Sequence, residues 1–192
     1  MKKNIYISYI NSDSMNFKNK IIDRFKGRKY KFSDESYDVI GTPAAITEDE
    51  KLKLAKKISV TDVTIVLISR NVLESKWIPL EIQYSLDLTS QLQYHTTPKG
   101  VIGVVIPDKG NDYSYMMSKG RKGIWGADKT KLPEIISANT LNEKVLQNKN
   151  NVNYDSYISI YRWEDFINDF NNCVNIAYEK ANESLENYKI TL

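Results

Sequence analysis

Cysteine and histidine are almost absent from this sequence. Among its 192 residues there is one cysteine, Cys173, and one histidine, His95. A single cysteine cannot form a disulfide within the chain, and the two residues do not make the Cys/His cluster that a zinc site needs. We therefore expect no metal ion and a reducing cytoplasm as the compartment. His95 lies in QLQYHTTPKG, which is typical of a helix end or loop, so we expect a surface position rather than a catalytic one.

Long hydrophobic runs are also missing. The longest are VTIVLI, at residues 63–68, and VIGVVI, at residues 101–106, whereas a membrane-spanning helix needs about 20 apolar residues. The first residues, MKKNIYISYINSD, hold two lysines but no long apolar stretch with a small-residue cleavage site. We expect neither a membrane partner nor a signal peptide.

Neither sign of charge dominates. The 27 basic and 24 acidic residues give a net charge of +3, whereas a dedicated nucleic-acid-binding domain usually has a clustered basic face. We therefore expect no nucleic-acid partner. Hydrophobic residues make up 41% of the chain, which is ordinary for a globular protein, and the length suits one domain with a sizeable core.

Strand and helix patterns alternate along the first half of the chain. In order, they are a strand at 4–10, a helix at 15–25, a short strand running into a polar loop at 29–41, a helix at 47–58, a strand at 62–69, a helix from 75 and a strand at 101–108. The two later strands lack polar alternation, which is typical of strands covered on both faces. This order predicts an α/β fold with a doubly wound parallel sheet.

The helix that starts near residue 47 carries two local signals. Thr47, with Glu50 three residues later, resembles a capping box that would satisfy the first backbone N–H groups. The apolar positions that we expect to face the core are Leu52, Leu54, Ala55 and Ile58.

Residues 107–156 lack a strong period, and roughly fifty such residues are long for a plain connection. We predict a single domain over 1–192 with an insertion at 107–156, before a fifth strand at 157–161. A final helix follows, with an apolar stripe made of Phe166, Phe170, Cys173, Ala177 and Ala181. Within the insertion, the basic residues Lys119, Arg121 and Lys122 could contact a pyrophosphate, although a solvated lysine-rich loop explains them more simply.

The stretch SKWIPLE, residues 75–81, predicts a helix start with a defined geometry. Ser75 can cap the helix, and Pro79 would lie in the first turn, where its missing N–H costs little. Trp77 and Glu81 would then lie one turn apart on the same face. The helix follows a buried strand, so its start lies near the carboxyl ends of the strands, where open α/β sheets bind ligands.

A carboxylate in that position could have a chemical role or a purely structural one. It could bind ribose hydroxyls, or stabilise an oxocarbenium ion as a glycosidic bond breaks. Alternatively, Trp77 packs on the sheet edge and Glu81 is a solvated first-turn acid favoured by the helix dipole. The spacing alone favours this structural role.

Three segments in order carry a resemblance to a known family. They are IYISYINSD at 5–13, DVTIVLIS at 62–69, and the S-x-W-x-P-x-E pattern at 75–81. Together they resemble a TIR domain, and more closely the TIR-like branch of bacterial antiphage systems such as Thoeris. The resemblance covers most of the chain and is weakest over 107–156.

This resemblance implies a flavodoxin-like fold with a five-stranded parallel sheet. It implies that the chain takes NAD as a substrate, with no separate cofactor, and cleaves the bond between nicotinamide and ribose. The ADP-ribose part would become a cyclic or conjugated second messenger that activates a downstream effector. The resemblance also implies self-association through TIR-like surfaces, with a site built across two protomers.

The resemblance also implies roles for particular residues. Glu81 corresponds to the catalytic glutamate and Trp77 to the motif tryptophan, while Ser8 and Tyr9 match the floor of the substrate pocket. The loop over 38–45 corresponds to the one that gates the site. The substrate-binding residues that we expect in that loop are Gly41 and Pro43, whose types suit special backbone conformations.

Two other functions remain open from the sequence. A TIR-like domain can act as a non-catalytic signalling module by homotypic assembly, in which case Glu81 is dispensable. A nucleoside deoxyribosyltransferase on a similar fold also places a carboxylate at a ribose. An assay of NAD consumption with product masses separates the three possibilities.

Overall fold

We describe the fold from a computed structural model, whose described residues are 2–27, 29–33, 46–87, 97–120, 123–142 and 156–192. The strands of its main sheet are β1 (Lys3–Ser8), β2 (Tyr30–Ser33), β3 (Val63–Ile68), β4 (Gly100–Val105) and β7 (Ser159–Arg162). All five are parallel, in the order β2-β1-β3-β4-β7. This is the flavodoxin-like order, with the change of direction between β1 and β3. The doubly wound parallel sheet is confirmed.

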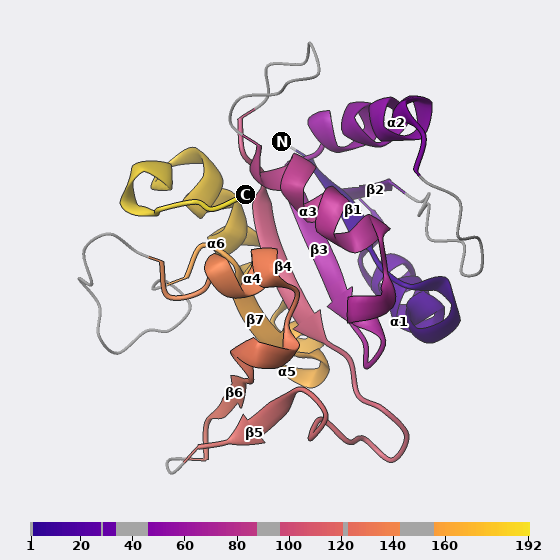
Figure 1. The fold of residues 1–192 in the computed structure, drawn as a ribbon, viewed down its shortest axis with the longest axis vertical. Helices are drawn as coiled ribbons and strands as arrows, with labels where there is room; N and C mark the ends of the chain where they lie inside the picture. The colour runs from indigo at the N-terminus through magenta and orange to yellow at the C-terminus, as the bar shows by residue number, and fades with distance from the viewer. Residues whose placement is uncertain (1, 28, 34–45, 88–96, 121–122, 143–155) are drawn as a thin grey trace.

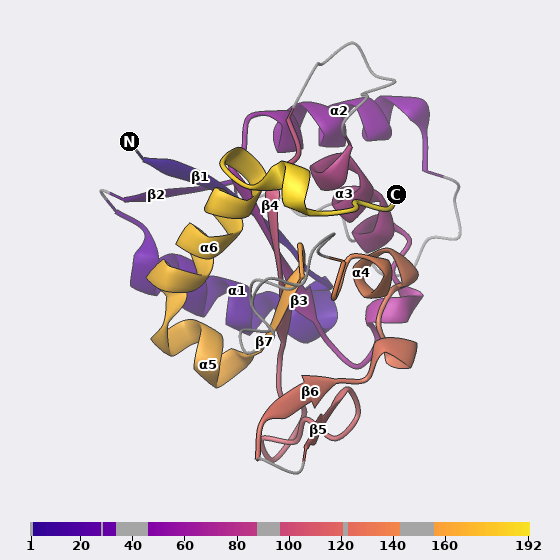
Figure 2. The same cartoon turned by 90° about the vertical axis from the view of Figure 1, so that its left-hand side faces the viewer.

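Helices cover both faces of this sheet. They are α1 (Asn11–Phe25), α2 (Glu48–Ser59), α3 (Trp77–Leu86), α4 (Glu134–Ala138), α5 (Trp163–Asn168) and α6 (Phe170–Asn182). Short 3-10 turns occur as η1 (Val72–Glu74), η2 (Lys129–Lys131) and η3 (Leu185–Asn187). Figures 1 and 2 show α1, α5 and α6 in one layer and α2, α3 and α4 in the other. Within the described ranges, no helix combines the length and apolar character needed to cross a membrane.

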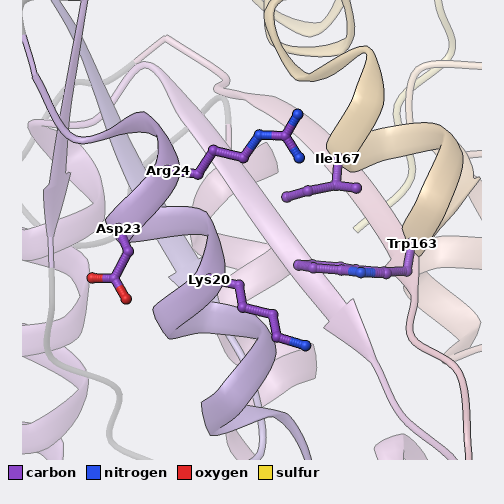
Figure 3. A pocket seen from close by; sticks show the side chains of 5 residues that line it. All are labelled: Lys20, Asp23, Arg24, Trp163 and Ile167. Carbon is purple, nitrogen blue, oxygen red and sulfur yellow. The ribbon is translucent and has the colours of Figure 1, made fainter.

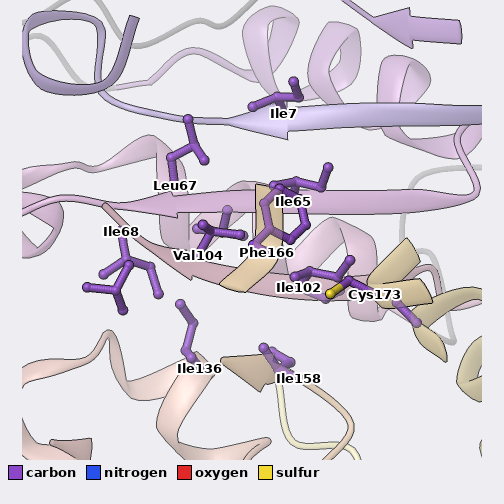
Figure 4. Packing of buried hydrophobic residues seen from close by; sticks show 14 of the residues in the cluster. Ile7, Ile65, Leu67, Ile68, Ile102, Val104, Ile136, Ile158, Phe166 and Cys173 are labelled. Atoms are coloured by element: carbon purple, nitrogen blue, oxygen red, sulfur yellow. The ribbon is translucent and has the colours of Figure 1, made fainter. Parts of the chain in front are cut away.

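The core lies on and around the two central strands. Every residue of β3 and β4 is buried, as their lack of polar alternation predicts. Figure 4 shows Phe166 and Cys173 packed over residues of the sheet such as Ile65 and Ile102. The predicted stripe of the last helix is buried throughout, although the helix is divided at Asp169 into α5 and α6.

Three local expectations can be compared with the structure. The capping box of Thr47 and Glu50 is confirmed. In the same helix, Leu54 and Ile58 are buried, but Leu52 is 42% exposed, so its assignment to the core was wrong. The first helix begins at Asn11, one turn before the predicted start, because the Ile10 carbonyl already accepts the N–H groups of Asp13 and Ser14.

The segment between β4 and β7 contains structure that the sequence pattern did not predict. It includes an antiparallel hairpin of β5 (Met117–Lys119) and β6 (Trp125–Ala127), which lies beyond the end of the main sheet in Figure 1. The guanidinium of Arg162 holds the hairpin against β7, at 5.8 Å from the Tyr113 ring and 5.0 Å from the Trp125 ring. The bounds of the insertion at 107–156 stay a prediction, and its residues 121–122 and 143–155 lie outside the described ones.

Two glycines of β4 allow a direct test of helix packing. A Cβ at Gly100 would lie 2.4 Å from the backbone oxygen of Ala177 in α6, whereas one at Gly103 would meet the Ile160 Cδ1 at 2.5 Å. A side-chain end can move, but the backbone of a packed helix cannot do so without disturbing its contacts. We expect Gly100→Ala to lower the free energy of unfolding by about 3 kcal/mol, and Gly103→Ala by about 1 kcal/mol. Urea unfolding measures both, and equal losses would contradict this packing.

The single cysteine provides a probe of global opening. Burial raises the pKa of the Cys173 thiol to about 12, with a further contribution from the charge of Asp169. The thiolate is the reactive form, so we expect a disulfide reagent at pH 8 to label the folded chain at least about 100-fold more slowly than the urea-unfolded chain. Equal labelling rates in the two states would contradict the buried position of Cys173.

Candidate active site

The start of α3 has the geometry that its sequence predicts. The Ser75 hydroxyl oxygen accepts from the backbone N–H groups of Trp77, at 3.2 Å, and Ile78, at 3.1 Å. Pro79 is the third residue of α3 and lies in its first turn. The cap and the proline together start the helix so that Trp77 and Glu81 lie one turn apart and both contact the layer formed by β1 and α2.

The carboxylate of Glu81 faces the protein interior, with 1% of the residue exposed. Its Oε1 accepts a hydrogen bond from the Tyr6 hydroxyl at 2.6 Å, and its Oε2 accepts one from the Ser8 hydroxyl. Tyr6 and Ser8 are two residues apart in β1, so the pleat of the strand directs both toward α3. The alternative of a solvated first-turn acid was therefore wrong.

Further buried hydroxyls join α3 to the sheet. Ser85, one turn after Glu81, donates from its hydroxyl to the Glu81 carbonyl at 2.8 Å. The same hydroxyl lies 2.8 Å from that of Thr64 in β3. Buried polar groups are stable only when they are hydrogen-bonded, and these contacts satisfy them while fixing α3 against β1 and β3.

Trp77 and Tyr6 belong to a small apolar cluster beside this carboxylate. Its buried members are Tyr6, Leu54 and Ile58, and Trp77, Leu80 and Tyr84 pack against them. The ring of Tyr6 thus packs against α2, while its hydroxyl contacts Glu81. Tyr6 is not among the predicted site residues, although its position two residues before Ser8 places both side chains on the same face of β1.

The structure brings some of the expected site residues together and separates others. Ser8 contacts Glu81, and Trp77 lies in the neighbouring cluster, but Tyr9 belongs to the main core on the side of α1. The Lys18 ammonium lies 5.6 Å from the centre of the Tyr9 ring, so the structure does not place Tyr9 beside Glu81. The expected residues outside the described ones are Gly41, Pro43, His95, Arg121 and Lys122.

A cavity of about 340 Å³ lies at the carboxyl ends of β1, β3 and β4. Three of its charged side chains bond within the protein: Asp13 accepts from Ser69 and Asn71, and Arg70 pairs with Asp108 at 2.6 Å. Hydrogen bonds from the Lys109 backbone N–H and from Arg70 hold the pKa of Asp108 below its usual value.

A shallower groove of about 460 Å³ lies between α1 and α5. In Figure 3, Lys20 and Arg24 extend toward Trp163 and Ile167, while Asp23 points away from them. Glu81 lines neither this groove nor the cavity at the strand ends. Within the described ranges, no group of three or more His, Cys, Asp or Glu side chains could hold a metal ion.

The flavodoxin-like sheet and the W-x-x-x-E helix that places its glutamate against β1 define a TIR-like domain. A family model described as "Thoeris protein ThsB, TIR-like domain" matches residues 6–111. The match spans more than half of the 192 residues, and the chain belongs to this family. It is therefore a TIR-like protein of antiphage defence. The matched region holds Tyr6, Ser8 and Glu81, whereas the β5–β6 hairpin and β7 lie beyond it.

The cap of α3 can be tested by removing its acceptor. Ser75→Ala leaves two first-turn N–H groups without this acceptor, so we expect the free energy of unfolding to fall by about 1 kcal/mol. Ser59→Ala, which removes an exposed hydroxyl at the end of α2, should change it by less than about 0.5 kcal/mol. Urea unfolding compares the variants, and a Ser75→Ala chain as stable as the parent would show that Ser75 does not cap α3.

Proposed function

We propose that this chain consumes NAD, cleaves the bond between nicotinamide and ribose, and makes an ADP-ribose-derived second messenger, cyclic or conjugated, in antiphage immunity. The observation that carries the proposal is the buried Glu81 carboxylate, held by hydroxyls from β1 in a Thoeris TIR-like domain. The proposal places the reaction in the cytoplasm, takes NAD as substrate without a separate cofactor, and includes a downstream effector that the diffusible nucleotide activates.

The reaction suits a single carboxylate. The ring nitrogen of nicotinamide carries a positive charge in NAD, so the leaving group departs as a neutral molecule without a general acid. Positive charge then develops at the ribose carbon and ring oxygen, as in glycoside hydrolysis. A carboxylate held in a water-excluded site stabilises such charge more strongly than it would in water, and its oxygens can accept hydrogen bonds from ribose hydroxyls.

Access to the carboxylate is part of the proposal. With 1% of Glu81 exposed, a ribose reaches it only when neighbouring groups move. A closed resting state suits the proposed activity, because an enzyme that destroys NAD has to be inactive until infection. Self-association through TIR-like surfaces is the proposed opening step. The turnover per chain should then rise with protein concentration.

The central test replaces Glu81. We expect Glu81→Gln, which keeps the size and a hydrogen-bond acceptor, to lower turnover by roughly 10²- to 10⁴-fold, or about 3–5 kcal/mol of activation free energy. Glu81→Ala should behave similarly. The matched control is Glu74→Gln in η1, an exposed glutamate that should retain full activity. Free nicotinamide and product mass are measured over a range of protein concentrations, with and without phage lysate.

The outcomes separate the candidate functions. Nicotinamide release with a cyclic or conjugated ADP-ribose product supports the proposal. Oligomers without NAD loss would indicate a non-catalytic assembly module, and nucleoside exchange without NAD loss would indicate a deoxyribosyltransferase. Turnover by Glu81→Gln at the parental rate would remove Glu81 from the mechanism.

A further inference from the structure

Tyr6 makes a contact that no sequence motif identified. Its side chain is fully buried, with 0% exposed, and its hydroxyl donates to Glu81 Oε1 at 2.6 Å. Ser8 donates to the other carboxylate oxygen. One donor on each oxygen defines the plane of the carboxylate as well as its position.

The orientation of a glutamate carboxylate needs such donors. Rotation about its last side-chain bond is broad and roughly two-fold, so the side chain itself sets the plane only weakly. Hydroxyl bonds to an ionised carboxylate are among the stronger hydrogen bonds in proteins. Two of them, directed to different oxygens, hold the plane that a ribose would meet.

The backbone that carries Tyr6 is firmly placed. Tyr6 lies within β1 and is paired with Ser33 of β2 on one side and Thr64 of β3 on the other. Its ring packs against Leu54 and Ile58 of α2. The hydroxyl is therefore positioned by the centre of the fold, which is where precise functional geometry is best supported.

We propose that Tyr6 is a positioning residue for Glu81 in the cleavage of NAD, an inference that rests on the function proposed above. The Tyr6 hydroxyl keeps its proton and touches no substrate atom. It holds the carboxylate so that charge on the ribose develops opposite the oxygens. Its loss lowers the rate of the chemical step more than it weakens substrate binding.

Tyr157 provides a matched control for this proposal. It is 1% exposed, and its hydroxyl donates to the Lys99 carbonyl at 2.9 Å. Tyr6→Phe and Tyr157→Phe therefore each delete one buried, hydrogen-bonded hydroxyl. They differ in the acceptor, which is Glu81 in one case and a backbone oxygen beside β4 in the other.

The test compares nicotinamide release by the full chain and its variants. We expect Tyr6→Phe to lower kcat roughly 10- to 100-fold with KM within about twofold, and Tyr157→Phe to leave both unchanged. The double variant Tyr6→Phe with Glu81→Gln should be no slower than Glu81→Gln alone, because Tyr6 acts through that carboxylate. Ser8→Ala, which removes the second donor, should show the same pattern and replaces Tyr6→Phe should that variant not fold.

Each result decides the question. A Tyr6→Phe chain with parental kcat, alongside an inactive Glu81→Gln chain, overturns the role of Tyr6 alone. An equal fall of kcat in Tyr157→Phe would show a general structural effect and would overturn the role of Tyr6. So would a double variant whose loss of kcat is the product of the losses in Tyr6→Phe and Glu81→Gln. No NAD loss by the parent chain, or full activity of Glu81→Gln, overturns the proposed function and the role of Tyr6 with it.

Discussion

The site depends on one constraint: a carboxylate taken out of water must be hydrogen-bonded. Burying an ionised group without partners costs several kcal/mol, and Glu81 is almost completely buried. The pleat of β1 meets this need by directing two hydroxyls, two residues apart, to the same face. The start of α3, set by Ser75, brings the glutamate to them. The site therefore forms only when the face of β1 that carries Tyr6 and Ser8 lies opposite the position at which the start of α3 places Glu81.

The sheet makes this agreement possible. Because β1 lies between β2 and β3, its backbone is fixed on both sides, and the order of strands changes direction there. The fully buried β3 and β4 accept helices on both faces, so α3 can pack on one face while α1 and α6 cover the other. The general rule that α/β sheets bind ligands beside such a change of direction agrees with the position of Glu81 against β1.

Much of this could be predicted from the sequence, for reasons that are local. Continuous apolar runs identify covered strands, and Ser75, Pro79 and Glu81 define a helix start within one turn. The β5–β6 hairpin was missed because three-residue strands are too short to show a period. Tyr9 was grouped with Ser8 by resemblance, whereas adjacent residues near the end of a strand face opposite sides. The burial of Glu81 could not be predicted from the spacing, which favours a solvated acid, because it depends on tertiary contacts with β1.

The central claim is that the Glu81 carboxylate meets the nicotinamide-bearing ribose. The most direct measurement is a crystal structure of the assembled protein with a non-hydrolysable NAD analogue. We expect ribose hydroxyls within hydrogen-bonding distance of Glu81 Oε1 or Oε2. An analogue bound elsewhere, with no atom of its ribose in contact with the Glu81 carboxylate, would contradict it.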